Sequence, residues 1–250
     1  MKRIIFIFSI FLTFSFSANA VNSSVKKAND LYAKGDYQAA ANAYEQILLT
    51  DGVAPELYFN LGNAYYKSGE VGRSILNYER ALRLNPTYDD AKANLEMAQL
   101  KVVDNVVQVP PFFIKRWISI LMKLLTSNEW LVISIISLVL TLSAMLFFVF
   151  GYSLTNRKIS FYLAVLLLCI TVLTGFFSGV RKYQMANHTD AIIMSGAVNV
   201  KSSPDKSGTD LFQLHEGTKV SIKSTLGNWT EIVLGNGSVG WVEDENIIKI

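Results

Sequence analysis

Few residues of this 250-residue chain belong to the types that carry out chemistry. The single cysteine, Cys169, lies inside an uncharged apolar stretch, so a disulfide within the chain and a cysteine metal cluster are both excluded. The histidines, His188 and His215, have no partners at metal-ligand spacing, and we expect both to be ordinary surface residues. The run Glu243–Glu245 is typical of a solvated acidic surface. Hydrolase, metalloprotease, nucleotide-binding and dithiol motifs are absent from the sequence. We therefore predict a protein that is not an enzyme, with no catalytic residue, no cofactor and no metal.

Residues 21–101 contain an internal repeat with an offset of 34 residues. Residues 29–48 align with residues 63–82, so that Tyr44 matches Tyr78 and Leu48 matches Leu82. A helix–turn–helix period of this length and pattern resembles the tetratricopeptide repeat. The second copy is nearly complete, the first departs at its opening helix, and residues 89–101 are expected to form a closing helix. About two and a half repeats are marginal for a shared core, so we expect a partner or the membrane to complete it.

The resemblance implies a concave groove, formed by the first helices of the repeats, that binds peptides or proteins. Repeats that grip a C-terminal carboxylate use lysine and arginine at positions occupied here by Val25, Asp90 and Asn94, so this clamp is missing. Packing between helices is the alternative role for the groove tyrosines. The expected partner-binding side chains, at spacings of three and four, are Asn29, Tyr32, Phe59, Asn63, Tyr66 and Lys67.

Two apolar stretches, Leu131–Tyr152 and Ile159–Val180, predict a transmembrane hairpin. Each has 22 residues without a charge, which gives about 33 Å of helix, enough to cross a hydrocarbon layer of roughly 30 Å. Only residues 153–158 separate them, so both ends of the hairpin leave on the same side. A buried hairpin in a soluble core is the alternative, but the chain offers no comparable apolar partner for it. Neither span contains Asp, Glu, Lys, Arg or His, which argues against a transport pathway.

The first 20 residues have the three parts of a secretory signal: a basic start, an apolar core and a small-residue cleavage site at residues 18–20. An uncleaved anchor is the alternative. Either form delivers the following residues to the outer side of the cytoplasmic membrane and leaves the turn at residues 153–158 in the cytoplasm. The positive-inside tendency supports this topology at Arg157 and Lys158, which lie in the cytoplasmic turn. It opposes the topology at the basic residues that flank the hairpin, because these lie on the outer side. We give the signal precedence because it acts first during insertion.

Residues 102–129 link the repeats to the hairpin. The apolar residues that share one helical face are Trp117, Ile118, Leu121, Leu124 and Leu125, and the only charges before Glu129 are Lys115, Arg116 and Lys123. This pattern predicts an amphipathic helix in the membrane interface, in contact with lipid, with a plain solvent-covered connector as the alternative.

Residues 188–250 consist of short β-rich runs separated by Gly, Asn, Asp and Ser-Pro turns, which predicts a small barrel of five or six strands. The runs at 198–201 and 237–242, the latter ending in Gly-Trp-Val, resemble bacterial SH3-like domains. Trp229 and Trp241 are candidates for a ligand groove, and packing at the ends of the barrel is their alternative role. Domains of this kind are often associated with cell-wall peptides, which makes peptidoglycan a candidate ligand by analogy alone.

Charge is distributed unevenly along the chain. Residues 102–187 have 7 Lys and Arg against 2 Asp and Glu, whereas residues 21–101 have 9 against 10 and residues 188–250 have 5 against 8. The basic excess thus lies beside the hydrophobic segments, where it can meet anionic headgroups. Neither candidate soluble domain is basic, so nucleic-acid binding has no electrostatic support.

The predicted fold class is a multidomain membrane protein with an all-α repeat region, a two-helix transmembrane hairpin and a small all-β SH3-like barrel. This order of parts resembles the E-type proteins of the bacterial aerotolerance (Bat) operons. The resemblance implies a multi-pass inner-membrane component with periplasmic repeat and SH3-like domains. Its implied partners are other Bat proteins, including membrane proteins with von Willebrand A-type domains, in tolerance of oxygen or envelope stress. The leading hypothesis is an envelope scaffold; a wall-sensing anchor and a regulatory subunit of a transporter are the alternatives.

Overall fold

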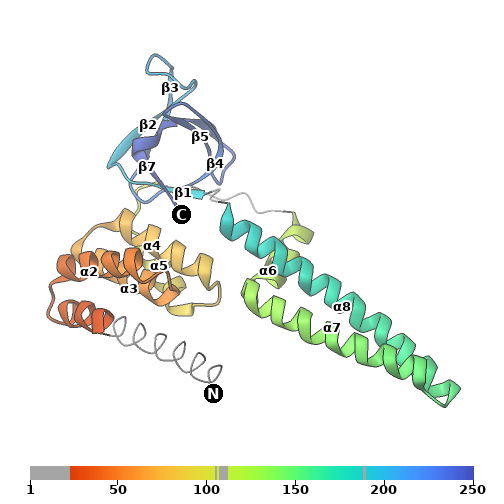
Figure 1. The fold of residues 1–250 in the computed structure, drawn as a ribbon. Coiled ribbons are helices and arrows are strands. Elements are labelled where there is room, and N and C mark those ends of the chain that lie inside the picture. Colours follow the sequence, from red (N-terminus) through yellow and green to blue (C-terminus); the bar gives the residue numbers. More distant parts are fainter. Residues whose placement is uncertain (1–22, 105, 107–111, 188–189) are drawn as a thin grey trace, which may run out of the picture. The chain divides into compact units, whose positions relative to one another are not determined.

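The computed structural model describes residues 23–104, 106, 112–187 and 190–250. The predicted signal at residues 1–20 lies outside this part of the chain, as does His188. The chain divides into two compact units. The first combines the repeat region with the C-terminal sheet, and the second contains the apolar hairpin and the helix before it (Figure 1).

The repeat region is a stack of antiparallel helices whose ends are fixed by local sequence. A helix over residues 23–33 is followed by α2 (Tyr37–Thr50), α3 (Pro55–Ser68), α4 (Val71–Leu84) and α5 (Asp89–Gln99). The Asp36 side chain accepts a hydrogen bond from the Ala39 backbone N–H and so caps α2. Pro55 opens α3, and Gly69 ends it in the left-handed conformation at φ +88°. The closing helix predicted at residues 89–101 is α5, which ends two residues earlier.

Small residues allow the helices of the stack to approach closely. A Cβ atom on Gly62 would lie 2.7 Å from two ring carbons of Tyr78, so only glycine fits where α3 crosses α4. Alanines at 0% exposure serve the same purpose between the earlier helices. The first repeat core consists of Ala28, Ala40, Ala41, Tyr44, Ile47, Leu57, Leu61, Ala64 and Tyr65.

The C-terminal region is an antiparallel sheet of seven strands in the order β3-β2-β6-β5-β4-β1-β7. This is more than the five or six strands predicted, because the last residues of the chain add a short strand against β1. Its core alternates inward side chains such as Val200, Ile232 and Val242 with outward polar ones. The strands are β1 (Asp190–Ile193), β2 (Ala197–Lys201), β3 (Asp210–His215), β4 (Lys219–Leu226), β5 (Trp229–Val233), β6 (Val239–Glu243) and β7 (Ile247–Lys249).

The sheet and the second repeat share one hydrophobic core within the first unit. Ile192 of β1 and Ile250 at the chain end are 0% and 5% exposed, and they belong to the cluster that contains Ile75, Tyr78 and Leu95 of the repeat helices. The partner that the marginal repeat stack was predicted to need is therefore supplied by the chain itself. The contribution of this burial is substantial, since each fully buried isoleucine is worth about 1.5–3 kcal/mol.

Polar contacts surround this shared core. Lys219 Nζ lies 2.8 Å from Glu79 Oε2, and the Gly72 backbone N–H donates to Glu216 Oε1 at 2.8 Å. Arg80 donates to the Lys249 carbonyl at 2.9 Å, and Arg83 donates to the Ile250 carbonyl. The end of the chain is therefore held by two arginines of α4.

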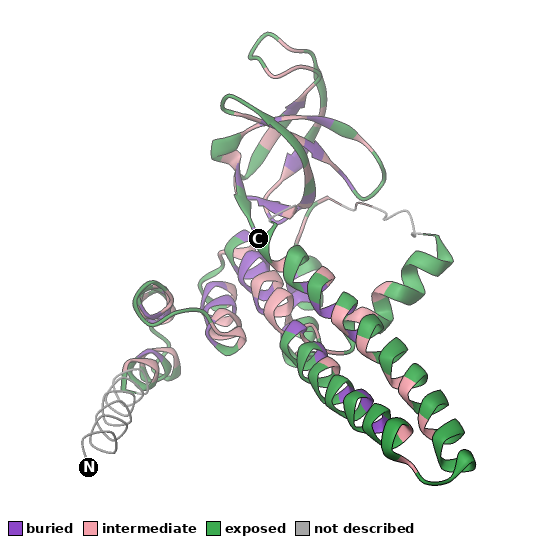
Figure 2. Cartoon of the chain, turned by 45° about the vertical axis from the view of Figure 1, so that its right-hand side comes forward, coloured by how far each residue is buried: buried purple, intermediate pink, exposed green. Residues whose placement is uncertain are grey.

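The second unit contains α6 (Phe113–Lys123), α7 (Ser127–Phe150) and α8 (Leu154–Ala186). Helix α7 begins with a capping box in which Thr126 and Glu129 exchange hydrogen bonds. The connection between α7 and α8 is shorter than the turn predicted at residues 153–158, because α8 already begins at Leu154. Both helices are long and apolar enough to cross a membrane, and their outward side chains are exposed (Figure 2). Exposed apolar faces of this extent argue against the alternative of a hairpin buried in a soluble core.

Small polar residues join the two long helices. Ser134 Oγ donates to the Thr171 carbonyl at 3.0 Å, and Ser137 Oγ donates to the Leu167 carbonyl at 2.9 Å. A Cβ atom on Gly175 would lie 3.3 Å from Ser134 Oγ, whereas one on Gly179 would meet nothing within 4 Å. Close helix approach therefore depends on Gly175 and not on Gly179.

Candidate partner-binding site

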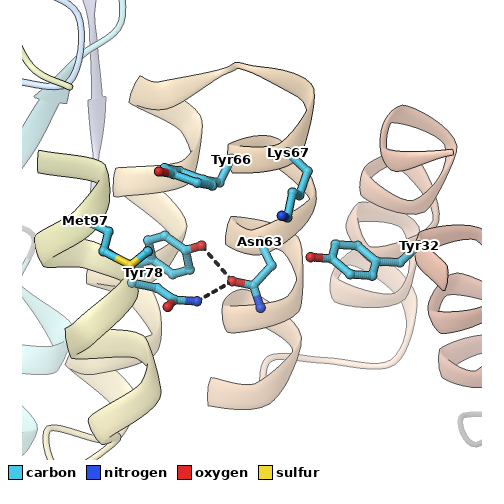
Figure 3. A pocket seen from close by; sticks show the side chains of 7 residues that line it. Tyr32, Asn63, Tyr66, Lys67, Tyr78 and Met97 are labelled. Atoms are coloured by element: carbon cyan, nitrogen blue, oxygen red, sulfur yellow. Dashed lines mark hydrogen bonds between the residues drawn. The ribbon is translucent and has the colours of Figure 1, made fainter. Parts of the chain in front are cut away.

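A pocket of about 240 Å³ opens on the repeat region, between the helix over residues 23–33, α3, α4 and α5 (Figure 3). Four of the six side chains predicted for the groove line it. Tyr78, Asn94 and Met97 complete the lining and were not predicted as site residues; Asn94 had been considered only as a residue that replaces a clamp lysine or arginine. The lining residues are Tyr32, Asn63, Tyr66, Lys67, Tyr78, Asn94 and Met97.

Asn63 is the central polar residue of the pocket, and its carboxamide has a fixed orientation. Its Oδ1 accepts hydrogen bonds from the Tyr78 hydroxyl at 2.6 Å and from Asn94 Nδ2 at 2.7 Å. Because both acceptor sites of Oδ1 are used, the Nδ2 group of Asn63 points away from Tyr78 and Asn94. Figure 3 shows the Lys67 ammonium and the Tyr32 hydroxyl pointing toward Asn63. The pocket therefore offers mainly hydrogen-bond donors, which suit a peptide carbonyl or a carboxylate.

The first repeat contains the equivalent hydrogen bond. The Tyr44 hydroxyl donates to Asn29 Oδ1 at 2.5 Å, one repeat before the bond from Tyr78 to Asn63. Asn29 is not among the residues that line the pocket. Phe59 is also outside the lining: its ring packs against Tyr88 at 5.0 Å and against Tyr78 at 6.1 Å between centroids. Packing is thus the observed role of Phe59.

Two tyrosines that line the pocket, Tyr78 and Tyr32, remain neutral at physiological pH. Burial raises the pKa of Tyr78 to about 12 and the pKa of Tyr44 to about 12. Burial and the neighbouring Tyr37 raise the pKa of Tyr32. At the rim, Lys101 Nζ lies 4.0 Å from the centroid of the Tyr66 ring, in a cation–π contact. Neutral hydroxyls beside two lysines give the pocket a recognition surface that favours an electron-rich ligand group.

Trp229 and Trp241 lie on one face of the C-terminal sheet. Trp229 pairs with Glu243, and Trp241 pairs with Glu231, on the adjacent strands β5 and β6. The buried residues of these strands, Thr230, Ile232, Gly240 and Val242, alternate with them and point inward. Both tryptophans are half-buried and lie outside the hydrophobic core of the sheet. Their placement on this face leaves both tryptophans outside the core of the sheet, so the ligand groove stays a prediction.

His215 differs from the ordinary surface residue that the sequence predicted. Its Nδ1 lies 2.8 Å from Asp104 Oδ1, and its backbone N–H donates to Asp104 Oδ2 at 2.6 Å. The Thr218 hydroxyl donates to the same carboxylate oxygen at 2.6 Å. This contact could not be predicted from local sequence, because 111 residues separate the two partners. Among the described residues, no group of three or more His, Cys, Asp and Glu side chains could hold a metal.

Comparison with known proteins agrees with this architecture. Residues 25–96 match the family model of the tetratricopeptide repeat, and residues 196–247 match that of the bacterial SH3 domain. The two predicted domain types are thereby confirmed. A tetratricopeptide repeat and J domain-containing co-chaperone of Cryptococcus neoformans is 34% identical over 67 residues, which cover 27% of this chain and 13% of the co-chaperone. The chain thus matches only a small part of that relative. Both domain types are typically non-catalytic and suggest protein–protein interaction or peptidoglycan binding.

Proposed function

We propose that this chain is a non-enzymatic membrane adaptor whose repeat pocket binds an extended segment of a partner protein. The observation that carries the proposal is the orientation of Asn63, whose Oδ1 accepts two hydrogen bonds and whose Nδ2 donors therefore point away from them, where a backbone carbonyl can bind. Lys67 adds a second donor and a positive charge. Neutral donors that are held in place by their neighbours bind a peptide at little cost in side-chain entropy.

Site-specific photocrosslinking tests this proposal in intact membranes. A photoreactive residue at Lys67 should form a discrete adduct with a protein partner, and Asn63→Ala should reduce that adduct strongly. The matched control is the same probe at Lys34, an exposed lysine that is not part of the pocket lining. Equal adducts from the two positions, or an adduct at Lys67 that persists in Asn63→Ala, would overturn the proposal.

Membrane topology is the second part of the proposal: both soluble domains lie on the periplasmic face of the inner membrane. Support comes from the shared core of Ile75, Ile192 and Ile250, because domains that pack together must occupy one side. Two crossings between them satisfy this requirement, and α7 and α8 are the two helices of sufficient length and hydropathy in the described chain.

Cysteine labelling tests the topology. In a Cys169→Ser background, cysteines introduced at Lys67 and Ser207 should react with a membrane-impermeant maleimide added to spheroplasts. A cysteine at Asn156, in the first turn of α8, should react only after the membrane is opened. Labelling of Lys67 and Ser207 from opposite sides would contradict the arrangement.

A Bat-type complex is the partner that we propose, and it is supported by the order of repeat, hairpin and SH3 domain. Affinity purification of the full chain from gently solubilised membranes should recover membrane proteins with von Willebrand A-type domains. Asn63→Ala should reduce their recovery if they bind through the pocket. A role in oxygen tolerance or envelope stress would follow from that association.

Peptidoglycan binding by the SH3 domain is the second candidate function, and the outward placement of Trp229 and Trp241 favours it. Retention of the full chain on purified peptidoglycan should fall in Trp241→Ala. The matched control is Trp117→Ala in α6, a tryptophan outside the SH3 domain. Retention that is equal in all three proteins would leave the adaptor as the function of this chain.

A further inference from the structure

Arg181 lies on the packed side of α8 and is only 6% exposed. It follows Phe177 and Ser178 on the same helical face, both of them buried. Ser178 exchanges hydrogen bonds with Ser127 at the start of α7, at 2.9 Å and 3.0 Å. Arg181 therefore belongs to the end of the hairpin at which α7 begins, about one turn beyond Ser178.

The guanidinium has two buried nitrogens without a partner. Nε and Nη2 make no hydrogen bond to any residue that the structure describes. Arg157, at the opposite end of the hairpin, is different: its Nε donates to the Phe148 carbonyl at 3.1 Å and its guanidinium lies over the Phe148 ring. A buried charge without a partner is strongly unfavourable, so Arg181 calls for a counter-charge.

The second unit cannot supply this counter-charge. Its single acidic residue between positions 110 and 188 is Glu129. The carboxylate of Glu129 accepts hydrogen bonds from the backbone N–H and the hydroxyl of Thr126, which complete the capping box of α7. Lys182, the next residue in the sequence, and Lys123, the last residue of α6, add further positive charge to the second unit. An anionic ligand would balance these positive charges.

The surroundings indicate that the anion belongs to a lipid. Trp130 connects the three helices at this end: its indole donates to the Met122 carbonyl at 3.1 Å and its ring packs on Phe177 at 5.2 Å. Helix α6 has no buried residue and presents an apolar hollow of about 460 Å³. A hollow of this kind accepts hydrocarbon. Its lining residues are Trp117, Ile118, Ile120, Leu121 and Leu124.

We propose that Arg181 binds the phosphate of a membrane glycerophospholipid, whose acyl chains lie along α6 and the hairpin. Nε and Nη2 form one edge of the guanidinium, and this edge matches two oxygens of a phosphodiester in a bidentate hydrogen bond. The inference rests on the membrane placement proposed above, but it is independent of the repeat pocket and of any protein partner.

Native mass spectrometry of the full chain in a neutral detergent tests the proposal, with phosphatidylglycerol as the probe. The wild type should retain a lipid adduct after delipidation, and Arg181→Gln should weaken its binding by at least about tenfold. The matched control is Lys182→Gln, which removes the same charge from the next, exposed residue and should leave binding within about twofold of the wild type. Partner crosslinking at Lys67 is measured separately, so failure of one proposal leaves the other intact.

Two further arms identify the ligand chemistry. A galactolipid with the same acyl chains but no phosphate should not bind, and a large excess of inorganic phosphate should not displace the phospholipid. If Arg181→Gln does not fold, Arg181→Lys keeps the charge but loses the two-donor edge, and its lipid binding should be several-fold weaker. Equal lipid binding in the wild type and the Arg181 variants would overturn the proposal, as would an equal loss in Lys182→Gln.

Discussion

Asn63 and Asn29 occupy equivalent positions in successive repeats, yet only Asn63 lines a pocket. Each asparagine accepts a hydroxyl from the tyrosine 15 residues later. Asn63 accepts a second bond from Asn94, which comes from the closing helix. The bond from Asn94 is thus found at the repeat whose asparagine lines the pocket.

This pairing predicts a difference between two otherwise identical substitutions. Tyr78→Phe and Tyr44→Phe each remove one hydrogen bond, and each should lower the free energy of unfolding by about 1 kcal/mol. Only Tyr78→Phe also loosens the Asn63 carboxamide, so only this variant should weaken partner crosslinking at Lys67. Denaturant unfolding and the crosslinking yield check the two effects. Equal crosslinking in the two variants would contradict the orientation that we assign to Asn63.

Asp104 provides a prediction about pH at the same scale. Although burial acts to raise it, the pKa of Asp104 is lowered by hydrogen bonds from Thr218 and from the ring and backbone of His215. A carboxylate with a lowered pKa in the folded state contributes stability that is fully present above its ordinary value of 3.8. This contribution is lost as the pH falls through the lower, folded-state pKa.

Asp104→Asn should therefore destabilise the protein at pH 7 by about 1–3 kcal/mol and reduce its sensitivity to acid. Urea unfolding of both proteins at neutral and acidic pH measures the difference, which should shrink as Asp104 of the wild type becomes protonated. A difference that stays constant down to the most acidic condition would show that the charge of Asp104 does not contribute.

The hairpin offers the clearest prediction at the scale of elements. Gly175→Leu places a side chain against Ser134, where a Cβ atom alone would be 3.3 Å from Oγ. It should force α7 and α8 apart and cost about 1–3 kcal/mol, typical of overpacking. Gly179→Leu is the control on the same helix, because a Cβ atom there meets nothing within 4 Å. Unfolding of the detergent-solubilised chain should distinguish the two variants, and equal losses would contradict the observed helix contact.

The elements themselves could be predicted from the sequence, because their signals are local or periodic. The 34-residue offset between Tyr44 and Tyr78, and the uncharged stretches around Ser137 and Gly175, are visible without any structure. Four groove residues followed from the resemblance to the tetratricopeptide repeat, which places the groove on the first helices of the repeats. Tyr78 was missed because it lies on α4, the second helix of its repeat. Asn94 and Met97 were missed because the pocket depends on the position of α5, which lies outside the complete repeats. A search for polar residues on the closing helix that face Asn63 would have found Asn94.

At the scale of the whole molecule, the contact between the repeat and SH3 domains could not be predicted. It depends on pairs that are far apart in sequence, such as Glu79 with Lys219 and Asp104 with His215. Neither partner of such a pair belongs to a motif. The observation that two and a half repeats are too few did predict that something must cover the stack. The structure identifies the cover as the sheet formed by the last 60 or so residues, a size at which a domain is itself only marginally stable.

The two soluble domains should consequently unfold as one unit. Ile192→Ala in β1 removes a side chain that is 0% exposed and belongs to the shared core, at a cost of about 2–5 kcal/mol. Ile248→Ala is the control, because Ile248 is 40% exposed on the neighbouring strand.

Hydrogen exchange of the full chain separates local from shared effects. The amides of α4 and α5 should lose protection in Ile192→Ala together with those of the sheet, although the substitution lies about 100 residues away in sequence from either helix. Loss of protection confined to the sheet would show that the repeats are stable without it. In that case the shared core could not be used to place both domains on one side of the membrane.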